Sequence, residues 1–358
     1  MRTIRTTLIP MLLAVAALGA GSAAASPAAA AGAAPRPAVA VADTTRLGIP
    51  WTRYTTGDRF GRTITFYVSN VPDSLRGRPL PLVLVIDGSG CQSAWKRVGE
   101  RIGGGHQNLM RRQARGRARV MIVEKPGVAF LDDPPHPGSA EGSSAEFRRE
   151  HTLERWSEAN VAALRAALAL PGVDARRVLV CGHSEGGTVG ARVAAVFPGV
   201  THAALLSCGG ATQVFDLAEF AGAPQPGDAP GAAAARRQSV FDEWAKIRAD
   251  SMNTERMWLG HPYRRWFTFC SGHALDDLLA TRARLYLAHG TEDRAVPVVA
   301  FDWVRAELAA RGREAVVERI EGADHGLFGP EGPPTDGTTV AGVEKVFGRV
   351  LDWFLGPA

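Results

Sequence analysis

The sequence has little that would hold a metal ion. It contains four cysteines and nine histidines, but no Cys-x-x-Cys pair and no two histidines four positions apart. These are spacings at which short motifs commonly bind zinc. We therefore expect no metal and no other cofactor.

Strong charge of one sign is also missing. The 358 residues include 41 basic and 36 acidic ones, for a formal net charge of +5. A mild excess of this size does not favour binding to the phosphate backbone of a nucleic acid. We expect no nucleic-acid partner, and the sequence does not indicate an oligomeric state.

Long hydrophobic runs are confined to the N-terminus. A charged start, an apolar run at 8–18 and three alanines at 23–25 have the pattern of a secretory signal. The run is too short to span a bilayer comfortably. We expect a cleaved signal peptide at 1–25, a disordered leader rich in alanine and proline at 26–42, and a secreted or periplasmic protein without a stable membrane anchor. The alternative is an N-terminal anchor that is never cleaved.

Cysteine is scarce but even in number. In an exported chain four cysteines can pair in three ways. Cys181 falls in a predicted buried strand, where a free thiol is expected. We favour a disulfide between Cys208 and Cys270, because these two flank an insertion. The pairing of the four cysteines, Cys91 included, stays open.

After residue 80, short apolar runs alternate with segments of helical periodicity. The predicted strands are 63–68, 82–87, 119–124, 177–181, 202–207, 284–289 and 315–320. The predicted helices lie near 96–115, 152–169, 186–197, 299–311 and 341–355. This alternation predicts an α/β domain over residues 43–358, with a mostly parallel sheet and helices on both faces. Ligands of such sheets bind at the carboxyl ends of the strands.

Two insertions interrupt the alternation. Residues 125–150 are rich in proline, aspartate and glycine and are predicted to form a long loop. Residues 211–270 are predicted to form a helical cap over the active site. The cap carries three tryptophans that are candidate substrate contacts, although apolar residues at helical spacing more often form a small core: Trp244, Trp258 and Trp266.

The most informative motif is Gly-His-Ser-Glu-Gly-Gly at 182–187, directly after a predicted strand. Gly-x-Ser-x-Gly between a strand and a helix is typical of a nucleophile elbow, a tight turn that exposes the serine hydroxyl. Gly182 and Gly186 would leave room for that turn. The pattern is short, so Ser184 becomes a convincing nucleophile only if its partners are present.

A catalytic serine needs a base, and the base needs a carboxylate that orients it. Asp293 follows the predicted strand 284–289, and His325 follows the next predicted strand on a glycine-flanked loop. Their order along the chain is the serine, acid, histidine order of α/β hydrolases. Glu292 would point away from the site, and His289 is expected to hold the Asp293 turn.

The oxyanion of such a reaction needs two N–H donors. The first expected donor is the backbone N–H of Glu185, at the start of the helix. The second is expected in the glycine-rich loop after strand 82–87, where Ser89 is the first choice and Gly90 the second.

These motifs resemble the α/β-hydrolase superfamily over roughly residues 60–350. The most specific stretches are His-Gly-Thr-Glu-Asp-Arg-Ala-Val-Pro at 289–297 and Ala-Asp-His-Gly at 323–326. They are similar to the catalytic domains of prolyl-oligopeptidase-type peptidases and to dienelactone-hydrolase-like esterases. The resemblance implies the same three roles for Ser184, Asp293 and His325 as nucleophile, acid and base.

We expect an exported serine hydrolase that cleaves carboxylic esters of small molecules through an acyl-enzyme intermediate. One alternative is a serine peptidase of the prolyl-oligopeptidase type acting on short peptides, in which Asp132, Asp133 or Glu185 would bind the substrate ammonium. A third hypothesis is a non-catalytic, hydrolase-like binding protein. The aromatic cap slightly favours the esterase.

Overall fold

The structure is a computed structural model, and all described residues belong to one compact unit, Pro37–Ala358. It describes residues 39–43, 47–75, 77–136, 138–333 and 340–357. The expected signal peptide, and the expected leader up to residue 38, lie outside these residues. Val41 and Ala42, the last two residues of that leader, belong instead to strand β1 (Val41–Asp43), which pairs with β2 (Trp51–Gly57).

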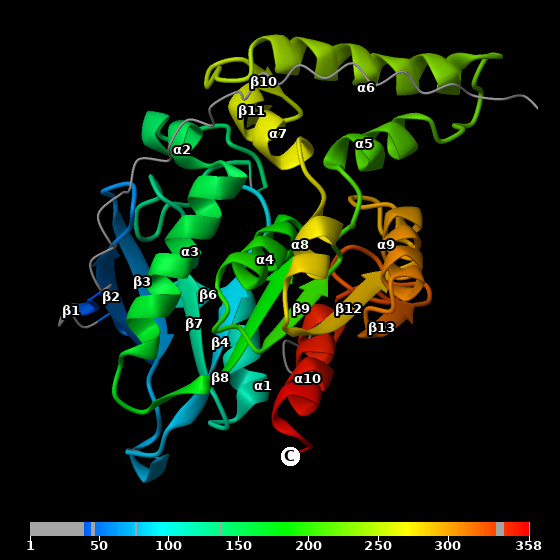
Figure 1. The fold of residues 1–358 in the computed structure, drawn as a ribbon. Helices are drawn as coiled ribbons and strands as arrows, with labels where there is room; N and C mark the ends of the chain where they lie inside the picture. The colour runs from blue at the N-terminus through cyan, green and yellow to red at the C-terminus, as the bar shows by residue number, and fades with distance from the viewer. Residues whose placement is uncertain (1–38, 44–46, 76, 137, 334–339, 358) are drawn as a thin grey trace, which may run out of the picture. The chain divides into compact units, whose positions relative to one another are not determined.

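A nine-stranded sheet forms the centre of the fold, in the order β1-β2-β3-β7-β4-β8-β9-β12-β13 (Figure 1). Its other strands are β3 (Thr63–Ser69), β4 (Leu80–Ile86), β7 (Arg119–Val123), β8 (Val173–His183), β9 (His202–Leu206), β12 (Arg284–Gly290) and β13 (Ala315–Ile320). Neighbours from β7 to β13 are parallel, whereas β1, β2 and β3 join antiparallel at one edge. The mostly parallel sheet is therefore confirmed, and every predicted strand is present.

Helices cover both faces of this sheet. The helices on one face are α3 (Leu153–Leu168), α4 (Glu185–Val196), α8 (Ala274–Ala280) and α9 (Val298–Ala310). The helices on the other face are α1 (His106–Ala114) and α10 (Gly342–Leu355). Side chains alternate between the faces of a strand, and in β4 Leu84 packs in the first core while Val83 and Val85 pack in the second. A central strand buried on both faces explains its continuous apolar run.

One predicted helix is partly wrong. Residues 95–104 form a hairpin of β5 (Trp95–Val98) and β6 (Arg101–Gly104), and helix α1 begins only at His106. Gly99 has a φ of +60°, which a two-residue hairpin turn accepts from glycine without strain. The helix predicted from residue 96 is therefore shortened by about ten residues at its start.

The two insertions contain regular structure. The loop predicted at 125–150 ends in a short helix, α2 (Ala145–Glu150), whose first turn is capped because the Ser144 hydroxyl accepts a hydrogen bond from the Phe147 N–H at 3.0 Å. Residues 211–270, the cap segment, hold α5 (Gln213–Ala221), α6 (Ala232–Ala249), β10 (Met257–Trp258), β11 (His261–Pro262) and α7 (Tyr263–Cys270). In Figure 1 α5, α6 and α7 lie together, outside the layers around the sheet. They share a small apolar core of their own.

The four cysteines are all buried and free. The disulfide favoured between Cys208 and Cys270 is therefore wrong. Cys208 packs in the core of the sheet, with its sulfur 3.2 Å from the Gly209 carbonyl oxygen, whereas Cys270 packs in the core of the cap segment. None of the helices in the described ranges is both long and apolar enough to cross a membrane.

Candidate active site

Ser184 sits in a strained turn between β8 and α4. Its φ of 57° and ψ of −127° lie in a region that side-chain-bearing residues rarely adopt. A Cβ atom at Gly182 would lie 2.0 Å from the Gly186 carbonyl oxygen, and one at Gly186 would lie 2.1 Å from the Ile86 carbonyl oxygen. Only glycine fits at both positions, which explains the motif and the tight turn that presents the half-buried Ser184 to the cavities.

Asp293 and His325 form a hydrogen-bonded pair. His325 Nδ1 donates to Asp293 Oδ2 at 2.8 Å, and Asp293 Oδ1 accepts the N–H groups of Ala295 and Val296 at 2.8 and 2.9 Å. Burial alone would raise the pKa of Asp293, but the hydrogen bond and charge of His325, with these backbone donors, outweigh it and lower the pKa. The carboxylate is therefore ionised near neutral pH and leaves the other ring nitrogen of His325 free to act as a base.

The loop that carries His325 is tied to the elbow. His183 Nε2 donates to the His325 carbonyl oxygen at 2.8 Å, and the Ser207 hydroxyl donates to the same oxygen at 2.9 Å. Burial, followed by the charges of His106 and His325, lowers the pKa of His183 to about 3. A neutral His183 therefore carries its proton on Nε2 and positions the main chain of His325.

His289 lies at the turn to which the sequence assigned it. Its Nε2 donates to the Val296 carbonyl oxygen at 3.0 Å and lies 3.5 Å from Asp293 Oδ2. The ring is fully buried and stacks on Phe301 at 5.1 Å. These contacts hold the Asp293 turn in place.

Two cavities meet at Ser184. The first, of about 400 Å³, lies between the elbow and the cap segment, and the second, of about 430 Å³, lies beside Asp87 and His106. The walls shared by both cavities are Ser89, Gly138, Ser184 and His325. No hydrogen bond joins the Ser184 hydroxyl to the His325 ring within the described ranges, a contact that often forms only once substrate is bound.

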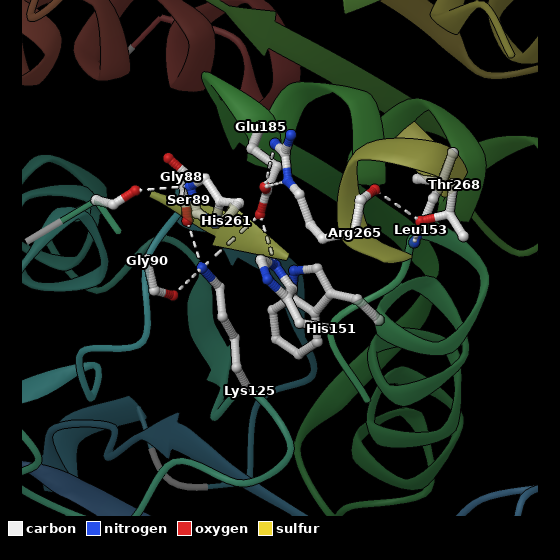
Figure 2. Close-up of polar contacts among 12 residues, drawn as sticks. Gly88, Ser89, Gly90, Lys125, His151, Leu153, Glu185, His261, Arg265 and Thr268 are labelled. Atoms are coloured by element: carbon white, nitrogen blue, oxygen red, sulfur yellow. Dashed lines mark hydrogen bonds and ion pairs between the residues drawn. The ribbon is translucent and has the colours of Figure 1, made fainter. Parts of the chain in front are cut away.

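A buried lysine holds the glycine-rich loop after β4. Lys125 Nζ donates to the carbonyl oxygens of Gly88 and Gly90 at 2.5 and 2.8 Å (Figure 2). The C=O and N–H of a trans peptide point in opposite directions. The bond to the Gly88 carbonyl therefore turns the Ser89 N–H away from Lys125. Ser89 lines both cavities and Gly90 lines neither, so the geometry favours Ser89 as the loop donor.

The carboxylate of Glu185 is fully engaged (Figure 2). His151 Nε2 donates to Oε1 at 2.8 Å, Arg265 donates to Oε2 at 3.1 and 2.6 Å, and Lys125 Nζ lies 3.8 Å from Oε1. Burial would raise the pKa of Glu185, but His151, Arg265 and Lys125 lower it well below its ordinary value. This carboxylate is not free to bind a substrate ammonium.

The other two carboxylates considered for that role lie at the surface. Asp132 is exposed and accepts the Ala129 N–H at 2.6 Å. Asp133 is exposed as well, and it lines only the second of the two cavities at Ser184.

The three tryptophans of the cap segment have different positions. Trp266 lines the first cavity. Trp258 packs on Trp266 at 5.2 Å between ring centroids, and Trp244 packs on Phe267 at 6.2 Å. Trp244 and Trp258 do not line this cavity and pack against the apolar core of the cap segment, to which Trp266 also belongs.

Sequence reasoning missed three polar residues of the site, Lys125, Asp216 and Arg265. Lys125 had a usable signal, because it lies two residues after the end of the central strand β7 in a chain with few lysines. Asp216 and Arg265 had none, since such contacts join distant segments, as Arg265 and Glu185 are joined over 80 positions of sequence. Within the described part of the chain, no group of three or more histidine, cysteine, aspartate or glutamate residues could hold a metal ion.

Comparisons with known proteins place the chain in a family. Residues 103–335 match the model of the alpha/beta hydrolase family. A search of curated proteins found no match. Among solved structures, the chain is similar to the acetyl xylan esterase from Paenibacillus sp. R4, at 15% identity and a TM-score of 0.53 over 90% of each chain.

Two peptidases are similar as well. Porphyromonas gingivalis dipeptidyl peptidase 4 has 15% identity and a TM-score of 0.55, over 86% of this chain and 36% of that one. Pyrococcus horikoshii acylaminoacyl peptidase has 15% identity and a TM-score of 0.54, over 86% of this chain and 42% of that one. At such identities these likenesses describe the fold alone. With the family match covering more than half of the chain, the protein belongs to the alpha/beta hydrolase family, as its motifs implied.

Proposed function

We propose that the protein is a serine hydrolase that cleaves carboxylic esters through an acyl-enzyme intermediate on Ser184. One observation carries this proposal. The strained elbow presents Ser184 to the same two cavities as His325, and the ring of His325 is oriented by an ionised Asp293.

The mechanism follows from these groups. Ser184 Oγ attacks the ester carbonyl carbon while His325 Nε2 accepts the hydroxyl proton, and Asp293 stabilises the imidazolium that forms. The tetrahedral intermediate collapses, His325 returns the proton to the leaving alcohol, and an acyl-enzyme remains. Water then attacks the acyl carbonyl with His325 as base, which releases the acid and restores Ser184.

Two N–H donors would stabilise the oxyanion, those of Glu185 and Ser89. Each such donor is worth about 3–4 kcal/mol in the transition state. Lys125 connects the two, because its ammonium binds the loop carbonyls and lies beside the Glu185 carboxylate. We propose that Lys125 is a positioning residue that keeps both donors aimed at one point.

The first cavity supports an ester with an apolar portion as substrate. Leu217, Leu259, Trp266 and Val296 supply carbon surface to its walls. A peptide substrate is the second candidate, because the fold is shared with two peptidases.

Hydrolysis of paired chromogenic substrates tests the proposal. We expect turnover of p-nitrophenyl esters, little turnover of aminoacyl p-nitroanilides, and loss of ester turnover in Ser184→Ala. Faster cleavage of the anilides would favour a peptidase. Tight binding of both substrate types without turnover would favour a binding protein.

We also propose export, on the strength of the pattern in residues 1–25 alone. Expression of the full chain in a bacterial host with a Sec pathway, followed by N-terminal sequencing of the exported protein, tests this. A mature N-terminus near residue 26 is expected. An uncleaved chain retained in the membrane fraction would contradict it.

A further inference from the structure

Asp216 is a buried carboxyl group without a partner. It lies in the first turn of α5, lines the first cavity and is only 7% exposed. Its Oδ1 atom is buried without a hydrogen-bond partner, and neither of its oxygens accepts a hydrogen bond from any of the described residues. Natural proteins rarely leave a buried carboxyl group unpaired, because the cost of desolvation is not recovered.

The groups that face Asp216 bring no positive charge. Asp293 and the thiols of Cys208 and Cys270 are the ionisable groups that interact with it. Arg265 lines the same cavity, but it is bound to Glu185 and to Gln213, where its Nη1 donates to Oε1 at 2.8 Å. Burial, followed by the charge of Asp293, raises the pKa of Asp216 to about 7. The free protein therefore holds a proton on Asp216 up to about neutral pH, and the ionised form has no neighbouring positive charge to stabilise it.

We propose that Asp216 binds an ammonium group on the acyl part of the substrate, so that the substrates are esters of amino acids. The proposal rests on the function proposed for Ser184, because it assigns the substrate class of that same site.

An ammonium ion fits this position better than a neutral donor does. It supplies up to three N–H donors for the two carboxyl oxygens, and its charge offsets the repulsion from Asp293. A hydroxyl would satisfy one oxygen but would bring no positive charge to stabilise the ionised carboxylate. Ser184 and Asp216 line one cavity, and its apolar walls include Leu217 and Leu259, which suit the carbon chain between an ester carbonyl and an amine.

Matched esters test the inference. The amine series is the methyl esters of glycine, β-alanine and γ-aminobutyrate, and the neutral series is those of propionate, butyrate and valerate, in which a methyl group replaces the ammonium. We expect the wild type to prefer the amine at one or more chain lengths, by about tenfold to a hundredfold in kcat/KM. Asp216→Asn should abolish that preference by slowing the amine esters while leaving the neutral ones unchanged.

Two controls locate the effect. Asp242→Asn removes the same charge from an exposed site on α6, and Asp133→Asn removes a charge from the second cavity. Both variants should keep the preference. The inference is overturned if the wild type shows no preference at any length, if the preference survives in Asp216→Asn, or if Asp133→Asn abolishes it.

A binding measurement separates this inference from the function proposed for Ser184. Calorimetric titration of Ser184→Ala with n-butylammonium should show binding that n-butanol lacks, and the added Asp216→Asn change should remove it. If none of the esters is hydrolysed but this binding occurs, the hydrolase proposal fails and the ammonium site stands. If ester hydrolysis depends on Ser184 but n-butylammonium does not bind, the ammonium site fails alone.

Discussion

Among the described residues, the buried carboxylates at the carboxyl ends of the strands have hydrogen-bond partners, whereas the buried carboxylate of the cap segment has none. At the carboxyl ends of the strands, Asp293 accepts hydrogen bonds from His325 and two backbone N–H groups, and Glu185, the first residue of α4, is bound by His151 and by Arg265 of the cap segment. In the cap segment, Asp216 lines the first cavity, and none of the described residues donates a hydrogen bond to it. We infer that the groups around Ser184 are complete before substrate arrives and carry the chemistry, whereas Asp216 of the cap segment is completed by the substrate and carries the specificity.

The largest expected loss of activity follows from removing the nucleophile, Ser184. Ser184→Ala should lower kcat for the best p-nitrophenyl ester by at least about 10⁴-fold, because no nucleophile remains. Steady-state kinetics would measure the loss. Ser271→Ala, at the exposed C-terminal end of α7, is the matched control and should retain full activity. Comparable rates in the two variants would remove the elbow from the chemistry.

The second largest loss of activity is expected for Asp293, the acid that orients His325. Asp293→Asn should lower kcat by about 10³-fold to 10⁴-fold, because the amide no longer holds the His325 ring in the correct tautomer. Asp324→Asn, one residue before His325, removes a carboxylate that accepts the Phe328 N–H and should cost far less. Similar losses in both variants, measured as kcat on one ester, would mean that Asp293 is not the orienting acid.

A smaller loss is expected from the residue that holds the oxyanion loop. Lys125→Met should lower kcat about 10²-fold, with KM changed by no more than a few-fold, because the loop donor matters mainly in the transition state. Lys246→Met, an exposed lysine paired with Glu243, should change neither constant. Thermal unfolding of both variants would check that the fold is intact. A rise in KM at constant kcat would assign Lys125 to substrate binding instead.

The smallest effect concerns stability in the cap segment. The pKa of Asp216 is raised to about 7, so the folded protein holds a proton that the unfolded chain releases. The stability from this group is complete at acid pH and is lost as the pH rises through about 7. Asp216→Asn should therefore exceed the wild type in unfolding free energy at about pH 8, by no more than about 4 kcal/mol, with little difference at about pH 4. Urea denaturation at both pH values would test this. A variant less stable than the wild type at the higher pH would show that Asp216 has a stabilising partner.

The strand ends and the cap segment also differ in how well the sequence predicts them. Every predicted strand is present, and the central ones could be recognised because buried parallel strands require continuous apolar runs. Ser184, Asp293 and His325 were proposed because each follows a predicted strand, and His325 follows the half-buried edge strand β13. The hairpin at 95–104 was predicted as helix, because its turn depends on Gly99 rather than on a periodic pattern.

Prediction from the sequence was less successful in the cap segment. Its three tryptophans were candidate substrate contacts, and of these only Trp266 lines the first cavity. No sequence pattern marks Arg265 or Asp216 as part of the site, because their roles depend on groups from distant segments that surround them in the fold. Contacts between segments that are far apart in the chain cannot be predicted from a local sequence pattern.

The central claim is that Ser184 is the activated nucleophile of the site. Incubation with a fluorophosphonate, followed by digestion and mass spectrometry, tests it most directly. We predict one adduct on the peptide that contains Ser184, slower labelling in His325→Ala, and none at this peptide in Ser184→Ala. An adduct on another serine, or equal labelling of Ser184→Ala and the wild type, would contradict the account.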